Sequence, residues 1–403
     1  IRERIMSLVK YAGVSLIAVS ASMGHAGGWE ASTLDTSLLY TEGSAGNVST
    51  ASLTPSHVAS QSRQYDTTTS SVARKVLNAE TRTSIAAKAD LGPVSVGVNN
   101  FKSGSIQFTG GSKTGGSWIP DADATMTTTS VTAKYAISDT YDILAGLSMN
   151  SLAAAEISTV KGTYNVGAKT STGYLLGAAY SIPEIALRVE ALYQPKSKIS
   201  SASSFTETAI PGGGAFVTYA DNITSGAMEA AQVGSYALSG GNAIVKDVAS
   251  FTTTLSRPET LTLNFQSGVN QRTLVFGSIH QATWSKSQIN AASGASTEIS
   301  TAFTDTTSYS IGLGRKINDN FSVSASFKSE EGSGATGTSY FTLSNGSQGI
   351  SLGGSYTMEN IEFRAGYNYT QIGGVTISDG LGQVALYPTN SISALGASAT
   401  IKF

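Results

Sequence analysis

The sequence predicts an all-β protein, a closed antiparallel β-barrel that spans a membrane. Three observations predict this fold: apolar and polar residues alternate over most of the chain, the connections between these stretches are by turns short and long, and a last strand runs to Phe403. Alternation with a period of two marks strands that have one apolar face. Membrane barrels keep short turns at one end and long loops at the other, which a soluble β-sandwich has no reason to do.

The composition favours the same class and excludes several functions. Asp, Glu, Lys and Arg make up 13% of the 403 residues, whereas about a quarter is usual in soluble proteins. The formal net charge of -2 argues weakly against nucleic acid as a partner, because its phosphates require a basic surface. The chain has no Cys, which excludes disulfides, thiolate metal sites and Cys nucleophiles.

Residues 1–26 have the pattern of a secretory signal peptide. Positive charges come first, at Arg2, Arg4 and Lys10. A short and mainly apolar run follows over 11–23, and small residues then lead to Ala26. This run is too short for a membrane-spanning helix, which needs about 20 apolar residues. We therefore expect export and cleavage after Ala26.

Residues 27–78 differ from the rest because their apolar residues do not alternate. The large ones are Trp29, Leu34, Leu38 and Leu39, which stand among Ser, Thr and Gly. We expect a compact irregular segment here, with a short helical turn near residues 31–40.

The barrel itself is expected over residues 79–403. In the stretch 361–370, one face carries Ile361, Phe363, Ala365, Tyr367 and Tyr369. The stretches 187–194 and 321–328 follow the same rule. Short junctions lie at 138–139, 183, 267–268, 318–320 and 359–360, and most of the alternate junctions are long, at 102–123, 196–255, 286–304, 330–343 and 372–390. This order is typical of an outer-membrane barrel.

The last strand gives a further sign of the location. Its alternating residues are Leu395, Ala397, Ala399, Ile401 and Phe403. A strand that closes a barrel must pair with the first strand and cannot trail into a flexible tail. A terminal Phe on such a strand is also a known feature of outer-membrane proteins. We therefore expect the bacterial outer membrane as the location.

Several motifs, in order and spacing, resemble one known family. Ala26-Gly27 stands at the processing site, and Ala-Gly-Asn-Val-Ser follows at 45–49. Leu-Ser-Arg-Pro-Glu at 255–259 is followed by Trp284-Ser285, and the hairpins at 308–329 and 350–371 precede the Phe-terminated strand. On these residues the chain resembles the FadL-type transporters of hydrophobic compounds, whose best-known members import long-chain fatty acids. One departure concerns residues 50–55, which read Thr-Ala-Ser-Leu-Thr-Pro where the family continues into Asn-Pro-Ala.

The resemblance implies a fold and a mode of action. It implies 14 strands and an N-terminal plug, or hatch, formed by residues 27–78 inside the lumen. It also implies passive transport, with ligand capture at the extracellular loops and sideways escape through a gap in the barrel wall. The expected partners are a hydrophobic small molecule, outer-membrane lipid, lipopolysaccharide and the barrel-assembly machinery. We expect a monomer with no cofactor and no nucleic-acid partner.

The apolar residues of the plug are the candidate ligand contacts. An apolar cleft stabilises a bound solute by about 0.8 kcal/mol for each buried methylene. We predict that Trp29, Leu34, Leu38 and Leu39 line such a cleft. The alternative is that these side chains only anchor the plug to the barrel wall.

Three other functions stay open from the sequence alone. An open porin for hydrophilic solutes would use inward-facing charges to set selectivity, and the candidates are Arg188, Glu190, Glu362 and Arg364, which we otherwise expect to pair across strands. A secreted β-rich adhesin would have the same strands without a membrane. An outer-membrane hydrolase would need His280, which follows Ser278 on a predicted strand.

Catalysis has little support in the sequence. The chain has no Gly-x-Ser-x-Gly elbow and no pair of His residues at metal-ligand spacing. His280 is better interpreted as a polar residue that faces the lumen. Asp121 and Asp123 form a weak candidate for a cation site. We expect neither an enzyme nor a metal centre.

Overall fold

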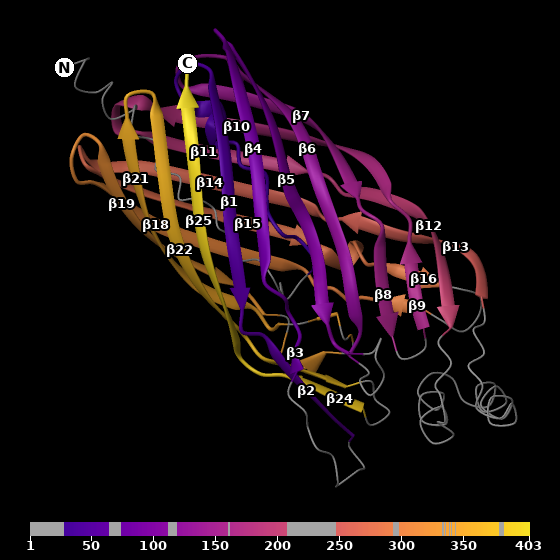
Figure 1. The fold of residues 1–403 in the computed structure, drawn as a ribbon. Helices are drawn as coiled ribbons and strands as arrows, with labels where there is room; N and C mark the ends of the chain where they lie inside the picture. Colours follow the sequence, from indigo (N-terminus) through magenta and orange to yellow (C-terminus); the bar gives the residue numbers. More distant parts are fainter. Residues whose placement is uncertain are drawn as a thin grey trace, which may run out of the picture.

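The computed structural model describes residues 28–63, 74–111, 119–159, 162–207, 247–292, 298–378 and 383–403, apart from Ser333, Ala335, Thr338, Tyr340 and Leu343. The predicted signal peptide at 1–26 lies outside these ranges. Within them the chain consists almost entirely of β-strands (Figure 1). None of the described helices is long and apolar enough to cross a bilayer.

Fourteen strands of the described ranges form a barrel; the sequence pattern predicts that it is closed and antiparallel, and the family resemblance implies the number. In order around the wall they are β1 (Ala45–Pro55), β4 (Glu80–Leu91), β5 (Val94–Thr109), β6 (Asp121–Ala136), β7 (Tyr141–Leu152), β10 (Lys169–Ile182), β11 (Leu187–Gln194), β14 (Glu259–Asn270), β15 (Thr273–Thr283), β18 (Thr306–Lys316), β19 (Phe321–Glu330), β21 (Ser347–Met358), β22 (Ile361–Ile372) and β25 (Asn390–Lys402). The barrel closes because β1 pairs with both β4 and β25.

The connections alternate as expected, so the barrel has a short-turn end and a long-loop end. The short-turn end lies at the top of Figure 1, where β25 finishes. It carries the 3-10 helix η2 (Pro183–Ile185). The long-loop end carries further strands: β2 (Val58–Arg63), β3 (Arg74–Lys75), β8 (Ala155–Thr159), β9 (Gly162–Val166), β12 (Ser197–Glu207), β13 (Asp247–Arg257), β16 (Asn290–Ala292), β17 (Glu298–Ser300), β20 (Thr336–Gly337), β23 (Val375–Ser378) and β24 (Gln383–Tyr387), and the helix η3 (Trp284–Lys286). All five predicted long junctions are therefore partly strand: β5 and β6 extend into 102–123, β12 and β13 into 196–255, and the short strands β16, β17, β20, β23 and β24 lie in the other three.

The outer face of the barrel is apolar and the inner face is polar. On β7, the outward Leu147 is 72% exposed, whereas the inward Asn150 is 0% exposed. On β22, the outward Phe363 and Tyr367 are exposed and the inward Glu362 is buried. This is the reverse of a soluble sandwich and matches the hydrocarbon layer of a bilayer, in which the closed sheet satisfies its own backbone. The secreted adhesin does not fit such a surface.

The barrel wall begins earlier in the chain than the sequence suggests. The predicted boundary stands at residue 78, but β1 already lies in the wall at Ala45–Pro55. Its Val48 pairs with Ala399 on β25 and with Ile85 on β4. The alternation is hidden because most outward positions of β1 are small or polar: Gly46, Thr50, Ser52 and Thr54. What lies inside the barrel is residues 28–44, called the N-terminal segment below, while β2 and β3 belong to the long-loop end.

We predict that Leu147→Arg destabilises the barrel in lipid vesicles by about 2–4 kcal/mol, the usual cost of a basic side chain facing the bilayer centre. The measurement is a guanidine titration of the folded barrel in vesicles. Asp139→Arg, in the short turn before β7, is the control. It should unfold at nearly the same guanidine concentration as the wild-type protein. Equal midpoints for the two variants would mean that the exposed apolar face is not in contact with lipid.

Candidate functional site at the gap between β4 and β5

The N-terminal segment crosses the barrel interior and contacts distant parts of the wall. On one side, Gly28 lies so close to Trp284 that a Cβ there would come within 2.2 Å of the indole ring. Glu30 Oε2 lies 3.0 Å from Nε2 of His280 on β15. On the other side, the segment reaches β5 at Gly104, where a Cβ would lie 2.8 Å from the ring of Trp29. Both glycines are therefore needed for close approach.

The wall has a gap where the segment meets β5. Residues of β4 and β5 pair from Leu91–Val94 to Ser84–Phe101, and no pairing between the described strands continues beyond that point. Yet β5 runs on to Thr109, paired with β6. Its register against β6 shifts between Lys102 and Gly104, which marks a bulge. A bulge inserts a residue, bends its strand and often ends the local pairing.

The N-terminal segment fills the edge that β4 leaves. The backbone N–H of Ala31 donates to the carbonyl of Ser103, and the N–H of Ser105 donates to the carbonyl of Trp29, both at 2.9 Å. These bonds flank an isolated antiparallel bridge between Glu30 and Gly104. Each such bond contributes about 0.5–1.5 kcal/mol. Residues 29–31 therefore close the gap with bonds that are weak enough to be exchanged.

Charged side chains also cross the gap. Glu80, at the end of β4, forms an ion pair with Arg82 at 3.0 Å and a second one with Lys102 at the bulge of β5. Arg82 in turn donates to the carbonyl of Ala31. Side chains and the N-terminal segment thus hold together two strands that no longer share a backbone ladder.

The lumen on the long-loop side of the segment is apolar. A buried cluster fills it, with contributions from the wall and from the extra strands. Its larger members include Trp29, Leu53, Ile106, Ile119, Met126, Leu152, Ile157, Tyr164, Ile199, Phe205, Leu255, Trp284, Ile289 and Phe303. Aromatic rings are in contact there, with centroids 4.5 Å apart for Tyr164 and Phe205 and 5.6 Å apart for Trp284 and Phe303. Trp29 places this cluster directly against the gap.

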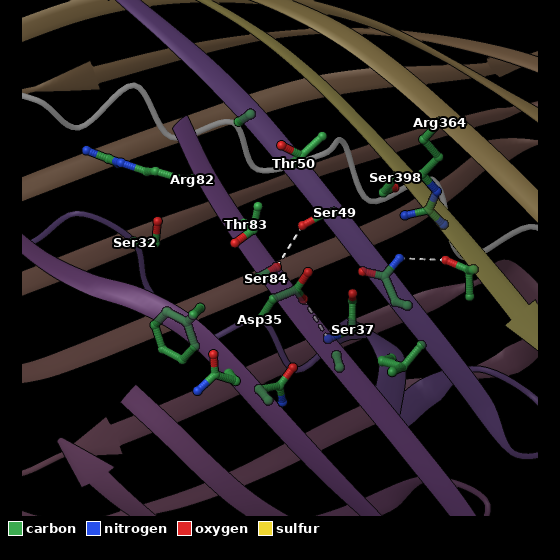
Figure 2. Close-up of a pocket in the computed structure, with 18 of the residues that line it drawn as sticks. Ser32, Asp35, Ser37, Ser49, Thr50, Arg82, Thr83, Ser84, Arg364 and Ser398 are labelled. Atoms are coloured by element: carbon green, nitrogen blue, oxygen red, sulfur yellow. Dashed lines mark hydrogen bonds between the residues drawn. The ribbon is translucent and has the colours of Figure 1, made fainter. Parts of the chain in front are cut away.

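The other side of the segment is polar. A cavity of about 150 Å³ lies between residues 32–41 and the wall formed by β1, β4, β5, β22 and β25 (Figure 2). Hydroxyl, amide and charged groups line it, among them Asp35, Asn47, Ser49, Arg82, Ser84, Arg364, Ser398 and Thr400. Ser49 and Ser84 are hydrogen-bonded across β1 and β4 at 2.7 Å. The cavity also reaches Phe101 and Lys102, so it adjoins the gap.

A buried carboxylate anchors the second half of the segment. Glu190, on β11, is 2% exposed. It accepts hydrogen bonds from Thr36 Oγ1 at 2.7 Å, from the Tyr40 hydroxyl at 2.6 Å and from Asn264 Nδ2 at 2.8 Å. Burial, reinforced by the charge of Glu190, raises the pKa of Tyr40 well above its usual value, so the phenol remains the proton donor.

The 3-10 helix η1 (Ser37–Tyr40) adds an apolar anchor beside Glu190. Leu39 is buried among Leu144, Leu175 and Leu192, which belong to β7, β10 and β11. The guanidinium of Arg188 lies 4.0 Å from the centroid of the Tyr40 ring, a cation–π contact. This short helix stands within the stretch where the sequence predicts a helical turn.

The four predicted ligand residues do not share one cleft. Trp29 belongs to the apolar cluster at the gap, whereas Leu39 and the partly buried Leu34 belong to the anchoring cluster at β7, β10 and β11. Leu38 lines the polar cavity. The anchoring role that the sequence left as the alternative describes the contacts of Leu34 and Leu39, and Trp29 alone stands beside the gap.

Sequence reasoning missed the residues that make the gap. Ser103 and Gly104 belong to no recognisable sequence motif, and neither does Glu80, the first residue of β4. The available signal is the stretch 99–105, polar or Gly except for Phe101, which interrupts the alternation between Val98 and Ile106. Because the bulge reverses which residues face inward, this signal does not by itself give the geometry.

The remaining candidates have structural roles. His280 Nδ1 lies 2.8 Å from Oγ1 of Thr262, while Nε2 faces Glu30, so both ring nitrogens serve the lumen wall and the N-terminal segment. Arg364 pairs with Glu362 at 2.9 Å, which lies on the same strand and not across strands as expected. In the part of the chain that the structure describes, no three His, Asp or Glu residues gather as a metal site.

Comparison with known proteins finds the same architecture among solved structures. No family model matches the chain, and no curated protein matches its sequence. Solved structures do match. A FadL homologue from Pseudomonas aeruginosa gives a TM-score of 0.68 at 13% identity, covering 91% of this chain and 92% of that chain. The Pseudomonas putida toluene transporter TodX gives 0.61 at 11% identity, covering 96% and 98%. The CymD monoaromatic hydrocarbon channel gives 0.57 at 13% identity, covering 90% and 89%. The chain therefore has the fold of the FadL-type barrels, over almost their full length.

We predict that Glu190→Leu loosens the N-terminal segment. Removing the carboxylate leaves the donors of Thr36, Tyr40 and Asn264 unmet in the lumen, and a lost hydrogen bond to a charged group costs about 1.5–3 kcal/mol. The measurement is the rate at which a maleimide labels a Ser37→Cys reporter in the purified barrel. Labelling should rise by about tenfold. Glu362→Gln is the matched control, and a rise in both variants or in neither would contradict the anchoring role.

Proposed function

We propose that the protein is a passive transporter of hydrophobic small molecules in the bacterial outer membrane. The observation that carries this proposal is the gap in the wall between β4 and β5, which residues 29–31 close from inside. The segment separates an apolar half of the lumen from a polar half, and the gap opens beside the apolar half through Trp29. We propose long-chain fatty acids as the solutes.

The physical argument for sideways release comes from the two halves of the lumen. A solute bound in the apolar cluster would lose about 0.8 kcal/mol of stabilisation for each methylene that it moved into the polar cavity. Leaving through the wall brings the same methylenes into acyl chains, where they stay out of water. The path through the gap is therefore the one that an apolar solute can follow without an energy source.

We propose that residues 28–44 act as the plug and that residues 29–31 act as its movable part. Residues 29–31 are the part of the segment that lies at the gap, and two backbone bonds join them to β5, whereas Thr36 and Tyr40 are held across the lumen by Glu190. A ligand shifts such an equilibrium only by binding one arrangement better than the other. Contact between the solute and Trp29 supplies this difference.

The solved structures of similar fold support the solute class. One is described as a toluene transporter and another as a monoaromatic hydrocarbon channel. These descriptions concern those proteins, and they agree with the apolar cluster found in this chain. Outer-membrane lipid with its lipopolysaccharide, the barrel-assembly machinery and the monomeric state remain predictions from the sequence.

An open porin is the second candidate, and the polar cavity beside β1 and β25 favours it. The N-terminal segment opposes it because it lies across the lumen. Bilayer conductance separates the two: large and stable currents from the wild-type protein would favour the porin and count against a plugged transporter.

We predict that a disulfide between residues 31 and 103 abolishes uptake. Ala31 and Ser103 are antiparallel neighbours, whose Cα atoms are about 5.5 Å apart in such pairs, within reach of a disulfide. The chain has no Cys of its own to compete. In cells that express Ala31→Cys with Ser103→Cys, uptake of a labelled long-chain fatty acid should fall by about tenfold under oxidation and return with reductant. The two single variants are the controls, and equal uptake in oxidised and reduced cells would refute the proposed gate.

We also predict that Gly104→Ala changes uptake, because the new Cβ would lie 2.8 Å from the Trp29 ring and push it from the gap. A plug that is displaced at this point should no longer seal the gap, so fatty-acid uptake should rise by a fewfold. In the purified barrel in detergent, a maleimide should also label an Ala31→Cys reporter faster. Gly46→Ala is the matched control, since nothing lies within 4 Å of its added Cβ. A similar result for both glycines would show that the Trp29 contact does not hold the plug.

A further inference from the structure

A buried cation stands at the apolar half of the lumen without an ion pair to any described carboxylate. Arg257, the last residue of β13, comes two positions after Leu255, a member of the apolar cluster, and therefore lies on the same face of the strand. Arg257 is 8% exposed. Its guanidinium has five N–H donors, and among the described residues its one hydrogen bond goes to Oδ1 of Asn150, at 3.1 Å. Such a charge is costly to bury unless another charge compensates it.

The charge that compensates Arg257 belongs to the N-terminal segment. Among the described carboxylates, that of Glu30 stabilises the guanidinium electrostatically. Glu30 is itself 8% exposed, and its Oε2 lies 3.0 Å from Nε2 of His280 on β15. Glu30 also forms the bridge to Gly104, in the middle of residues 29–31. The part of the plug that we propose to move therefore carries the negative charge that a buried cation of the lumen requires.

A further polar group lies on the wall between Arg257 and His280. Thr260 follows Arg257 by three residues and is a diagonal neighbour of His280, because Thr262 pairs with His280 and Thr260 pairs with Ala282. Thr260 is 2% exposed, and its hydroxyl finds no hydrogen-bond partner among the described residues. A buried polar group without a partner is unfavourable. An added oxygen atom would therefore be stabilised beside Thr260.

The three side chains of Arg257, Thr260 and His280 form a set that suits a negatively charged oxygen group, and we call them the anion site. Arg257 supplies a positive charge, and Thr260 supplies a hydroxyl donor. Because an ionised carboxylate only accepts hydrogen bonds, Nε2 of His280 is the donor toward Glu30 and can donate to another carboxylate in the same way. The apolar cluster continues beside the anion site through Leu255. The anion site and the cluster together fit a carboxylate that is joined to an apolar tail.

We propose that Glu30 is a built-in competitor for an anionic solute. Its carboxylate keeps the plug closed by compensating Arg257 and binding His280, and the head group of the solute takes its place at the anion site. This inference rests on the proposed transport function and deepens it. It assigns amphiphiles with one anionic head as the solutes and makes the charge of that head the signal for opening.

The selectivity of this gate follows from the buried charge. When residues 29–31 withdraw with no solute present, Arg257 loses its compensating charge, which is unfavourable. An incoming carboxylate restores that charge and so lowers the free energy of the open arrangement. A neutral solute of the same length does not, because a ligand shifts such an equilibrium only by binding one arrangement better than the other.

The test compares dodecanoate with dodecanol, which have carbon chains of equal length and differ in charge at mildly alkaline pH. Equilibrium dialysis of each radiolabelled solute against the purified full chain in a non-ionic detergent gives the ratio of the two affinities. A general loosening of the plug changes both affinities and leaves this ratio unchanged. Glu30→Gln removes the competitor and should raise the ratio in favour of dodecanoate by about tenfold. Arg257→Met removes the cation and should lower it by about tenfold.

A double variant tests the competition itself. In a protein that already carries Arg257→Met, Glu30→Gln should no longer raise the ratio, because the charge for which the two carboxylates compete is gone. A merely structural role of Glu30 would give the same increment in both backgrounds. Arg257→Lys keeps the charge and should keep the ratio near the wild-type value. The matched controls are Glu362→Gln and Arg364→Met, which break an ion pair on β22 and should leave the ratio unchanged.

A second measurement keeps the anion site and Glu30 intact. In the barrel with an Ala31→Cys reporter, dodecanoate should speed labelling by a maleimide by a fewfold, because Ala31 is buried while the plug is closed. Dodecanol at the same occupancy should leave the labelling rate nearly unchanged.

The outcomes separate this inference from the proposed function. If the wild-type barrel binds neither solute, the proposed transport function fails, and this inference fails with it. If the barrel binds both solutes, the transport function stands, and the competitor is overturned by an unchanged ratio in Glu30→Gln and Arg257→Met or by equal labelling rates with the two solutes. Heat-modifiable migration in gels checks that each variant has folded. The reporter experiment still decides the question if Arg257→Met fails to assemble, because it retains Arg257.

Discussion

The structure depends on one constraint: backbone groups of a wall in a membrane must find hydrogen-bond partners within the protein. Thirteen neighbouring strand pairs and the closing pair meet it by antiparallel ladders. Two of these ladders stop short: β4 and β5 separate after Ser84 and Phe101, and β10 pairs with β11 only from Leu176 onward. At the first of these breaks, Ala31 and Trp29 supply backbone bonds to β5. A gap in the wall is thus compatible with the membrane because a segment from inside completes the exposed edge.

The same segment divides the lumen into two environments. Residues near Trp29 face the apolar cluster, and residues 32–41 face the polar cavity. Glu190 and the cluster around Leu39 fix the part of the segment that is far from the gap. The segment is therefore held on both sides of the lumen, by β5, His280 and Arg82 at residues 29–31 and by Glu190 and the Leu39 cluster at residues 34–40.

Much of the wall was predictable, and the site mostly was not. Strands such as β7 and β22 alternate between apolar and polar residues because one face meets lipid, and local patterns report that directly. β1 was not predicted because its outward positions carry Thr50, Ser52 and Thr54, so apolar and polar residues do not alternate along it. Trp29 was found as a candidate by its size, but its place beside Gly104 was not, since a bulge follows from pairing with β6 and leaves no motif.

By itself, the sequence determined that this is a membrane barrel with short turns at one end, an irregular leading segment and no evident catalytic chemistry. These properties are local or periodic, so they can be read from neighbouring residues. Only the tertiary structure decided that β1 belongs to the wall and that the pairing of β4 with β5 ends at Phe101. It also decided that Glu190 accepts hydrogen bonds from Thr36 and Tyr40, which are more than a hundred residues away in the sequence. The physical reason is that barrel closure sets the register of every strand, and register determines which distant groups meet.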